Sequence, residues 1–461
     1  MKIILQKLIS IILDYPRWII ALTAFITVVM ISFATQLKMN FSIEELFAIN
    51  DPNVEKYFDF LEEFDREDNL ILLMYECEDP FSYENLKLNK SLIEKFETIK
   101  GIDEVTGLSN LEIFTNGEDE LLRSVYPYIP QSTDSLFDAK KRITSSELVQ
   151  ETLISRDGKL ASIAIELDES FNNHDMRERI IEKIDVYQNS VNWTWHQSGL
   201  PILRTRYVQL MVADTIRFLI PVAVMIVILF TLVFRSWLAL LVPMSIIIMV
   251  VIWTIGLMVT LNIDFNIMTY IIPTLLFIIG IGDSVHFLVK YFGTLSEVKD
   301  KKKALSQTLE KIGTAIFLTS ITTSIGFGSL IRSNIDIVRQ FGMMTAAGVM
   351  FAFILTVTYL PAMIMLCKQT PIKKLKSYSL GFRINILKGF INVVSSYPKP
   401  IIIFTFFFAI ISVIGASKIN SHNSLMDDLK PGINLYDDMM VAEKRMGAIL
   451  PLELIVSIKN P

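Results

Sequence analysis

Three ionisable residues lie close together in an otherwise apolar stretch, GIGDSVHFLVKY, at residues 280–291. At 100° per residue, Asp283, His286 and Lys290 share one face of a helix. Lys290 is near the end of the apolar run, where its ammonium group can reach polar surroundings. Asp283 lies deeper, where a charged carboxylate costs about 2.5–3.5 kcal/mol. Residues at such positions usually serve ion or proton movement, and the alternative is a protonated aspartate that only hydrogen-bonds a neighbouring helix.

A second polar surface is expected in the apolar run GTAIFLTSITTSIGFGSLI, residues 313–331. Small and hydroxyl-bearing residues there form a stripe that permits close helix approach and can hydrogen-bond a carboxylate. Glycines beside Asp283 would also permit close approach of the two helices. The alternative is that these small residues only pack the helices together and have no role at the carboxylate. Because a histidine one turn away can share or orient a proton, we predict a proton relay of Asp283, His286, Thr322 and Thr323. The helix-packing residues predicted at the relay are Gly280, Gly282, Thr319 and Gly326.

The composition indicates a membrane protein. Of 461 residues, 52% are hydrophobic, whereas soluble domains average about 45–50%. Runs long enough to cross a ~30 Å hydrocarbon core as helices occur at residues 18–36, 216–234, 237–260, 267–289, 313–331, 341–366 and 400–417. We expect local helix bends at Pro221, Pro243, Pro273 and Pro361.

Basic residues are concentrated in alternate links between these runs. The links at 290–313 and 367–390 are lysine-rich, the second link is Arg235-Ser236, and the N-terminus carries Lys2 and Lys7. By the positive-inside rule these segments are cytoplasmic. Alternation then places the polar segment 37–213 outside. We therefore expect a multi-pass protein of a bacterial-type cytoplasmic (inner) membrane, with its N-terminus in the cytoplasm.

A long repeat relates the two ends of the chain. Tyr-Pro precedes both the first and the seventh run, and a strand-like segment follows each, NLILLMYE at 69–76 and LELIVSIK at 452–459. The offset is about 380 residues, which indicates a large duplication. The first run is therefore expected to be a retained helix rather than a signal peptide. We expect one complete half followed by the start of a second, with 418–461 beginning a second outer domain.

The polar segment 37–213 is expected to be an α+β domain. Strands are predicted at 69–76, 105–108, 152–155, 160–167 and 192–196, and helices at 83–100 and 175–188. Asp157-Gly158 is a strong hairpin signal. This order predicts a βαββαβ, ferredoxin-like arrangement, with residues 111–147 as a loop or helical insertion. The predicted fold class is a polytopic α-helical membrane protein that carries this extracytoplasmic domain.

Several functions are not expected. Cys77 and Cys367 fall on opposite sides of the predicted membrane, so no disulfide framework is expected. The histidines lack metal-ligand spacing, and no GxxxxGK[ST] phosphate loop is present. His196, beside Trp193 and Trp195, is typical of strand packing. We therefore expect no enzyme, no cofactor, no metal and no nucleic-acid partner.

The whole layout resembles the resistance-nodulation-division (RND) superfamily, most closely its MMPL-like exporter branch, which is related to sterol-sensing-domain proteins. The resemblance is carried by GIGDSVHFLVKY, by SITTSIGFGSLIRSNIDIVRQFGMMTAAGVMFAFILTVTYLPAMI at 320–364 and by SGLP at 198–201. It implies that Asp283 occupies the place of the family's proton-coupling aspartate, with Thr322 and Thr323 matching polar threonines of the fifth helix. Many members have Asp-Tyr or Asp-Asp where this chain has Asp283-Ser284, and His286 is a hypothetical replacement for part of that pair.

The resemblance also divides the chain. It implies a first membrane helix, a porter-like domain, an MMPL-like bundle of helices two to six, a basic cytoplasmic linker, a seventh helix and the start of a second outer domain. The corresponding ranges are 1–36, 37–213, 214–367, 368–399, 400–417 and 418–461.

We expect a proton-driven exporter of lipid-like or amphiphilic molecules, whose partners are the lipid bilayer and its hydrophobic substrate. A homo-oligomer and a periplasmic partner are left open. The alternative is a lipid sensor or assembly factor that does not transport. A protein-translocation motor ranks last, because the motifs of that branch are not found.

Overall fold

The chain forms two compact units in a computed structural model. The helical unit contains Met1–Lys38 and Asp214–Ser424, and the sheet unit contains Met39–Ala213 and Leu425–Pro461. The structure describes residues 2–40, 46–48, 51–63, 69–114, 122–126, 129–144, 149, 152–171, 173–234, 236–367, 389–418, 429 and 431–447. The strand predicted at 452–459, residue Arg235 and most of the linker 368–399 lie outside the described residues.

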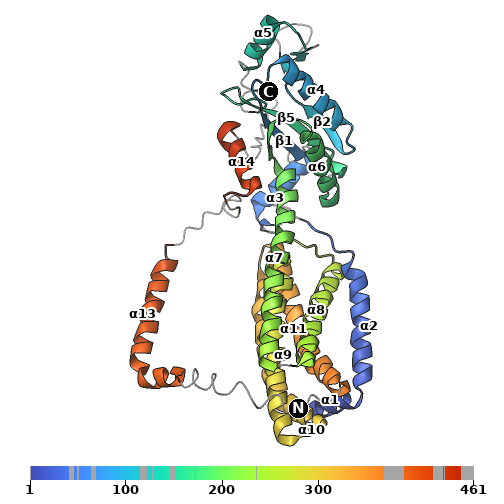
Figure 1. Cartoon of the computed structure of the whole chain (residues 1–461), viewed down its shortest axis with the longest axis vertical. Coiled ribbons are helices and arrows are strands. Elements are labelled where there is room, and N and C mark those ends of the chain that lie inside the picture. Colours follow the sequence, from blue (N-terminus) through green and yellow to red (C-terminus); the bar gives the residue numbers. More distant parts are fainter. Residues whose placement is uncertain are drawn as a thin grey trace. The chain divides into compact units, whose positions relative to one another are not determined.

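Seven helices among the described residues are long and apolar enough to cross a membrane, and each overlaps one of the predicted apolar runs (Figure 1). They are α2 (Pro16–Ala34), α7 (Leu200–Phe234), α8 (Trp237–Thr260), α9 (Ile272–Val298), α10 (Lys301–Gly328), α11 (Asp336–Leu366) and α13 (Pro398–Ala416). A shorter helix, α1 (Lys2–Asp14), precedes them, and short 3₁₀ turns, η4 (Thr269–Ile271) and η5 (Ser329–Arg332), lie beside α9 and α10. The chain is thus a polytopic helical protein with a small sheet.

The helices extend beyond the apolar runs because local capping signals set their ends. The Asp300 side chain accepts a hydrogen bond from the Lys303 backbone N–H at 2.7 Å, which starts α10. Lys299, just before it, has φ 57° and ends α9. The lysine-rich link predicted at 290–313 is therefore mostly helix. Pro273 lies in the first turn of α9. A backbone N–H there has no partner within the helix, so proline at this position does not require the predicted bend.

Glycines bring the helices of the helical unit into close contact. Helix α11 packs against α2, α8, α9 and α10. A Cβ atom on Gly256 of α8 would lie 2.9 Å from the Met30 carbonyl oxygen of α2, and one on Gly348 of α11 would lie 2.6 Å from Leu276 of α9. Gly256 faces backbone that cannot easily move, so this position favours glycine, whereas a larger residue at Gly348 would require the Leu276 side chain to shift. Neither glycine was singled out in the sequence.

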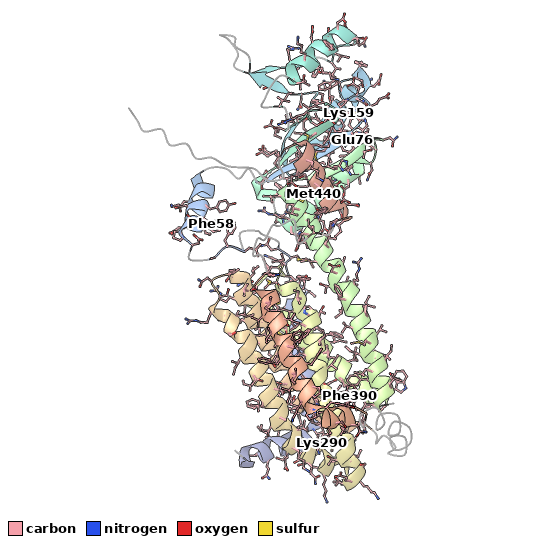
Figure 2. All side chains as sticks on the ribbon, turned by 90° about the vertical axis from the view of Figure 1, so that its left-hand side faces the viewer. Phe58, Glu76, Lys159, Lys290, Phe390 and Met440 are labelled. Carbon is pink, nitrogen blue, oxygen red and sulfur yellow. The ribbon has the colours of Figure 1, made fainter. Side chains whose placement is uncertain are left out.

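The sheet unit contains a four-stranded antiparallel sheet in the order β2-β5-β1-β6. Its strands are β1 (Leu70–Glu76), β2 (Ile102–Thr106), β5 (Leu160–Leu167) and β6 (Thr194–Ser198). Helix α4 (Tyr83–Glu97) connects β1 to β2, and the 3₁₀ turn η3 (Glu169–Phe171) and helix α6 (His174–Gln188) connect β5 to β6. Figure 2 marks this unit by Glu76 and Lys159.

Two segments of this unit differ from the prediction. The strand expected at 152–155 makes only an isolated bridge between Ile154 and Ala161, although the turn at Asp157-Gly158 forms, with Gly158 at φ +68°. The insertion at 111–147 contains a second hairpin as well as a helix, α5. Its described elements are β3 (Glu112–Phe114), β4 (Leu122–Ser124) and α5 (Thr133–Thr144).

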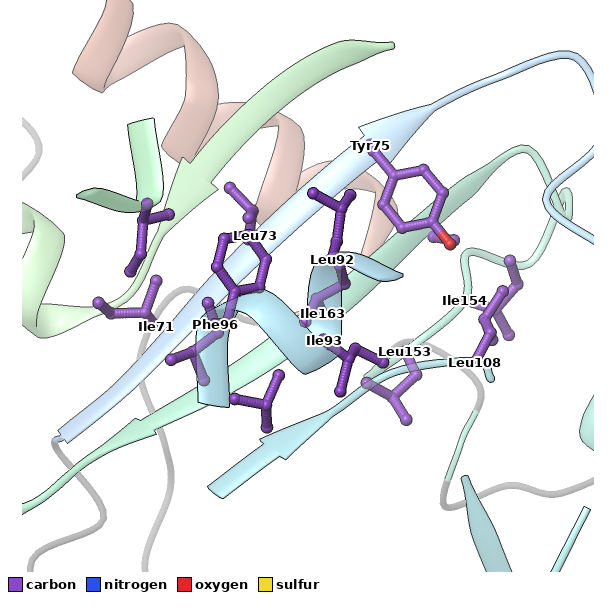
Figure 3. Close-up of a cluster of buried hydrophobic side chains, with 14 of the residues drawn as sticks. Ile71, Leu73, Tyr75, Leu92, Ile93, Phe96, Leu108, Leu153, Ile154 and Ile163 are labelled. Atoms are coloured by element: carbon purple, nitrogen blue, oxygen red, sulfur yellow. The ribbon is translucent and has the colours of Figure 1, made fainter. Parts of the chain in front are cut away.

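One face of the sheet forms the main hydrophobic core. Alternate residues of β1, namely Ile71, Leu73 and Tyr75, are fully buried against Leu92, Phe96 and their neighbours on α4 (Figure 3). Trp193 stacks on Tyr75 at 4.2 Å between ring centroids, and the Tyr75 hydroxyl accepts a hydrogen bond from Asn89 at 3.1 Å. Burial raises the pKa of Tyr75.

The opposite face is covered by helix α14 (Asn434–Arg445), which packs beside β6. Met74 and Leu160 of the sheet form a buried cluster with Ala442 and Met446. His196, which lies on β6 as expected, points to this side as well, and its Nδ1 lies 2.7 Å from Asp438 Oδ1, a contact that the sequence did not predict. Helix α14, which the sequence analysis assigned to the start of a second outer domain, thus packs on this sheet.

Candidate functional site

Helix α9 places Asp283 at its contact with α10. The side chain is half-buried, and its Oδ2 accepts a hydrogen bond from Ser320 Oγ of α10 at 3.1 Å. Ser320 is only 3% exposed. Because α9 and α10 both qualify as membrane spans, this bond joins a carboxylate and a hydroxyl across two apolar helices.

Ser284, the neighbour of Asp283, faces the interior of the helical unit. It is fully buried, and its Oγ has no hydrogen-bond partner among the described residues. One turn earlier, a Cβ on Gly280 would lie 3.7 Å from Ala352 of α11 and from Ile247 of α8. Continuing along α11 by one turn leads to Thr356, which is also fully buried with an unpartnered hydroxyl in the described structure. Two buried hydroxyls are thus found near Asp283. Ser284 is its neighbour in α9, and Thr356 lies one turn after Ala352, the residue of α11 that faces Gly280.

His286 and Lys290 share the helix face of Asp283, as the spacing predicts, but differ in exposure. His286 is exposed and Lys290 is half-buried. Lys290, labelled in Figure 2, lies well before the end of α9 at Val298. The apolar run ends near Lys290, although the helix does not.

The predicted hydroxyl stripe of α10 is not brought to Asp283 in this chain. Thr319 and Thr322 are exposed, Thr323 is half-buried, and all three hydroxyls donate to backbone carbonyls of their own helix. Gly282 and Gly326 have nothing within 4 Å of an added Cβ, so they do not mediate packing here. The cause is the rotation of α10, which turns Ile316 and Ser320 inward instead. Of the predicted packing glycines, only Gly280 lies against neighbouring helices.

Ser320 is the hydrogen-bond partner of Asp283 that the sequence analysis missed. The signal that could have found it is the spacing of Ile316, Ser320 and Ser324 at i, i+4 and i+8, which puts them on one face. Ser324 also points inward and donates to the Ala346 carbonyl of α11 at 3.1 Å. The predicted threonines lie on the neighbouring face of α10, where Thr319 and Thr322 are exposed.

The chemistry available at this site is proton exchange. A carboxyl group can accept a hydrogen bond when ionised and donate one when protonated, and a serine hydroxyl can do both. Among the described residues no group of three or more His, Cys, Asp or Glu side chains could hold a metal ion. The thiols of Cys77 and Cys367 are free.

Comparison with known proteins places these features in a family. The model of the MMPL family matches residues 112–399, well over half of the chain. The membrane protein MJ1562 from Methanocaldococcus jannaschii is 29% identical over 133 residues, which cover 29% of this chain and 34% of that protein. The match thus spans about a third of the length of that relative. The chain belongs to the MMPL family of membrane proteins.

Proposed function

We propose that this protein is a proton-driven exporter of lipid-like or amphiphilic molecules, with Asp283 as the proton-carrying group. Membership of the MMPL family supports a transport-related role. The observation that carries the proposal is the hydrogen bond between Asp283 and Ser320 across two candidate membrane spans. An ionised carboxylate in the middle of a membrane span costs about 2.5–3.5 kcal/mol, and aspartates in such positions therefore usually have a functional role.

Proton binding would change the contact between α9 and α10. Ionised Asp283 accepts the Ser320 hydroxyl hydrogen at 3.1 Å, whereas protonated Asp283 can donate to the same oxygen. The buried hydroxyls of Ser284 and Thr356 are unpartnered in the described structure, and polar groups of this kind are often bridged by buried water. We propose that they lead the proton inward from Asp283, and that His286 is its exposed neighbour.

The arrangement in the membrane is part of this proposal. The N-terminus would be cytoplasmic and residues 37–213 extracytoplasmic, in accordance with the lysine-rich links. We interpret the four-stranded sheet as a ferredoxin-like βαββαβ unit, since its strand order and its two crossover helices agree with that arrangement. It would form the path for the substrate.

The test is proton uptake by proteoliposomes under an imposed pH gradient. Wild type should take up protons, and Asp283→Asn should not, while inserting normally. Ser320→Ala should slow uptake, because it removes the hydrogen-bond partner of Asp283. Ser324→Ala is the matched control, since Ser324 lies one turn further along α10 and donates to a backbone carbonyl instead.

The same experiment distinguishes this proposal from the alternative, a lipid sensor or assembly factor. If Asp283→Asn takes up protons as fast as wild type, Asp283 is a structural hydrogen bonder and the proposal is wrong. A lipid sensor or assembly factor would then be the better interpretation, and it would be indifferent to the pH gradient.

A further inference from the structure

Helix α1 and two candidate membrane spans enclose an apolar groove in the helical unit. Helix α1 packs against α10 and α11, with Ile9, Ile12 and Leu13 buried, and Figure 1 shows it beside α10. Asp14, the last residue of α1, forms an ion pair with Lys302 in the first turn of α10. The groove between the three helices has a volume of about 750 Å³, within the range of about 300–1,000 Å³ for small-molecule sites.

The lining of the groove changes from polar to apolar along α10. Glu310 lines it near the start of this helix, and Phe317 lines it seven residues later. Phe353 of α11 lies beside Phe317, with 5.5 Å between the ring centroids. At a rise of 1.5 Å per residue, Glu310 and Phe317 are separated by about 10 Å along the helix axis. An amphiphile with its head group at Glu310 would therefore place its chain against the two rings.

Gly313 provides the room for such a chain. It lines the groove between Glu310 and Phe317, and a Cβ added there would have nothing within 4 Å. Among the described residues, neither Asp283 nor Ser320 lines the groove. The groove is thus a different site from the predicted proton relay, although α10 contributes to both.

Glu310 gives the groove its charge. Its side chain is exposed and has no ion-pair partner among the described residues. Thr314, one turn further along α10, also lines the groove. An ionised carboxylate only accepts hydrogen bonds, whereas an ammonium group only donates them. The polar end of the groove therefore suits a cationic, hydrogen-donating head group, and a purely anionic head group would be repelled there.

We propose that this groove binds a membrane lipid whose head group carries a primary amine. The ammonium group pairs with Glu310, and one acyl chain lies over Gly313 and reaches Phe317 and Phe353. A lipid is the occupant that the surroundings supply, because α10 and α11 both qualify as membrane spans. This binding site is additional to the proposed export function and does not depend on proton coupling.

Photolabelling of the full chain in vesicles tests the site. The vesicles contain phosphatidylglycerol with a trace of phosphatidylethanolamine that carries a diazirine on one acyl chain, and labelled peptides are identified by mass spectrometry. We expect label on α10 and α11 around Phe317 and Phe353. It should be about threefold stronger than with phosphatidylglycerol that carries the same chain, as for an exposed charge pair. Equal labelling of α13, which has no buried residue, would indicate surrounding lipid only and overturn the proposal.

Filling the groove tests where the chain lies. Gly313→Leu meets no neighbouring atom within 4 Å of its Cβ, so the helices should keep their packing. It should lower labelling of α10 about tenfold, because the new side chain displaces about two methylene groups of the lipid. Gly293→Leu in α9 is the matched control, since Gly293 is also open within 4 Å and does not line the groove. Undiminished labelling of Gly313→Leu would overturn the proposal.

Removing the charge tests the head group. Glu310→Gln should retain labelling by the acyl chain but lose the preference for phosphatidylethanolamine. Glu297→Gln, at an exposed position of α9, is the matched control and should keep that preference. A preference that survives Glu310→Gln would overturn the proposed pairing. Asp283→Asn should be labelled like wild type even if it takes up no protons, so the outcome for this site is distinct from the outcome for proton-driven export.

Discussion

The two copies of the repeat contain helices of similar local structure and opposite packing. Helices α2 and α13 each have 19 residues and begin with proline after a tyrosine, whose backbone angles nearly coincide at φ −120°, ψ 46° and φ −128°, ψ 45°. Yet α2 packs against α8 and α11, whereas α13 has no buried residue. For α3 (Pro52–Glu63), which follows α2 in the first copy, and α14, which follows α13 in the second, the order is reversed, since Met439 of α14 is buried and Phe58 of α3 is exposed.

This contrast separates what forms a helix from what positions it. The Tyr-Pro start and the apolar run act within a few residues, so both copies form the same helix. Packing depends on partners far away in the chain, such as Trp253 for α2 and Glu76 for α14. In the described structure, α2 and α13 thus share their local structure but differ in their contacts.

The largest expected effect distinguishes α14 from α3. Met439→Ala removes a side chain that is 2% exposed, and such losses cost about 2–5 kcal/mol. Amide hydrogen exchange should show α14 losing most of its protection. Phe58→Ala on α3 is the matched change, and because Phe58 is 44% exposed it should alter local stability by no more than about 0.5 kcal/mol. Equal effects of the two changes would contradict the observed asymmetry.

The next prediction concerns α2 and α13. Gly256→Leu would push a side chain against the Met30 carbonyl oxygen, 2.9 Å from the new Cβ, and overpacking typically costs about 1–3 kcal/mol. Thermal unfolding in detergent, followed by tryptophan fluorescence, should shift to lower temperature. Gly415→Leu in α13 adds the same atoms where nothing lies within 4 Å, so its unfolding temperature should equal that of wild type. A lowered temperature in both variants would mean that α13 is packed as α2 is.

The sequence predicted the elements well where the signal is local. The apolar runs locate all seven candidate spans, and the helices and strands around the β1, β2, β5 and β6 sheet lie close to their predicted ranges. The packing of α14 on β1 and β6 could not be predicted in this way, since residues such as His196 and Asp438 are 242 positions apart. Residue spacing within one segment contains no information about such a partner.

The candidate site shows the same limit at the scale of one helix. Asp283 was predicted from the free-energy cost of a charged side chain within an apolar run, and this cost can be assigned to a single residue. Its partner depends on how α10 is rotated about its axis, and contacts with α9 and α11 set that rotation. The prediction selected Thr322 and Thr323 because hydroxyls are frequent on that face, whereas packing turns Ser320 inward.

A smaller effect sharpens the comparison of α2 with α13. The Thr27 hydroxyl donates within α2 and accepts a hydrogen bond from Trp253 Nε1 at 2.9 Å. Thr405 of α13 donates only within its own helix among the described contacts. Thr27→Val should therefore cost about 0.6 kcal/mol more than Thr405→Val, the average for interhelical hydrogen bonds in membranes. The difference should appear as a lower unfolding temperature for Thr27→Val, and its absence would show that the Trp253 contact contributes nothing.

The smallest effect is the pH dependence of α14 docking. Hydrogen bonds from the Ser155 hydroxyl and the Lys159 backbone N–H, with a further contribution from Arg445, hold the pKa of Asp157 below its ordinary value of 3.8. A lowered folded-state pKa means that this stabilisation is present above pH 3.8 and is lost as the pH falls through the folded value. The part of this stabilisation that is due to Arg445 holds α14 on the sheet, and it is small because the Asp157 side chain is 51% exposed.

Hydrogen exchange of α14, corrected for the intrinsic rate, should therefore accelerate below pH 3.8 more in wild type than in Asp157→Asn. Helix α3 should show no such difference between the two proteins, because its last turn contains no basic residue to pair with Asp157. An identical pH response of α14 in both proteins would mean that Asp157 does not hold Arg445, and that Glu76 alone anchors this end of the helix.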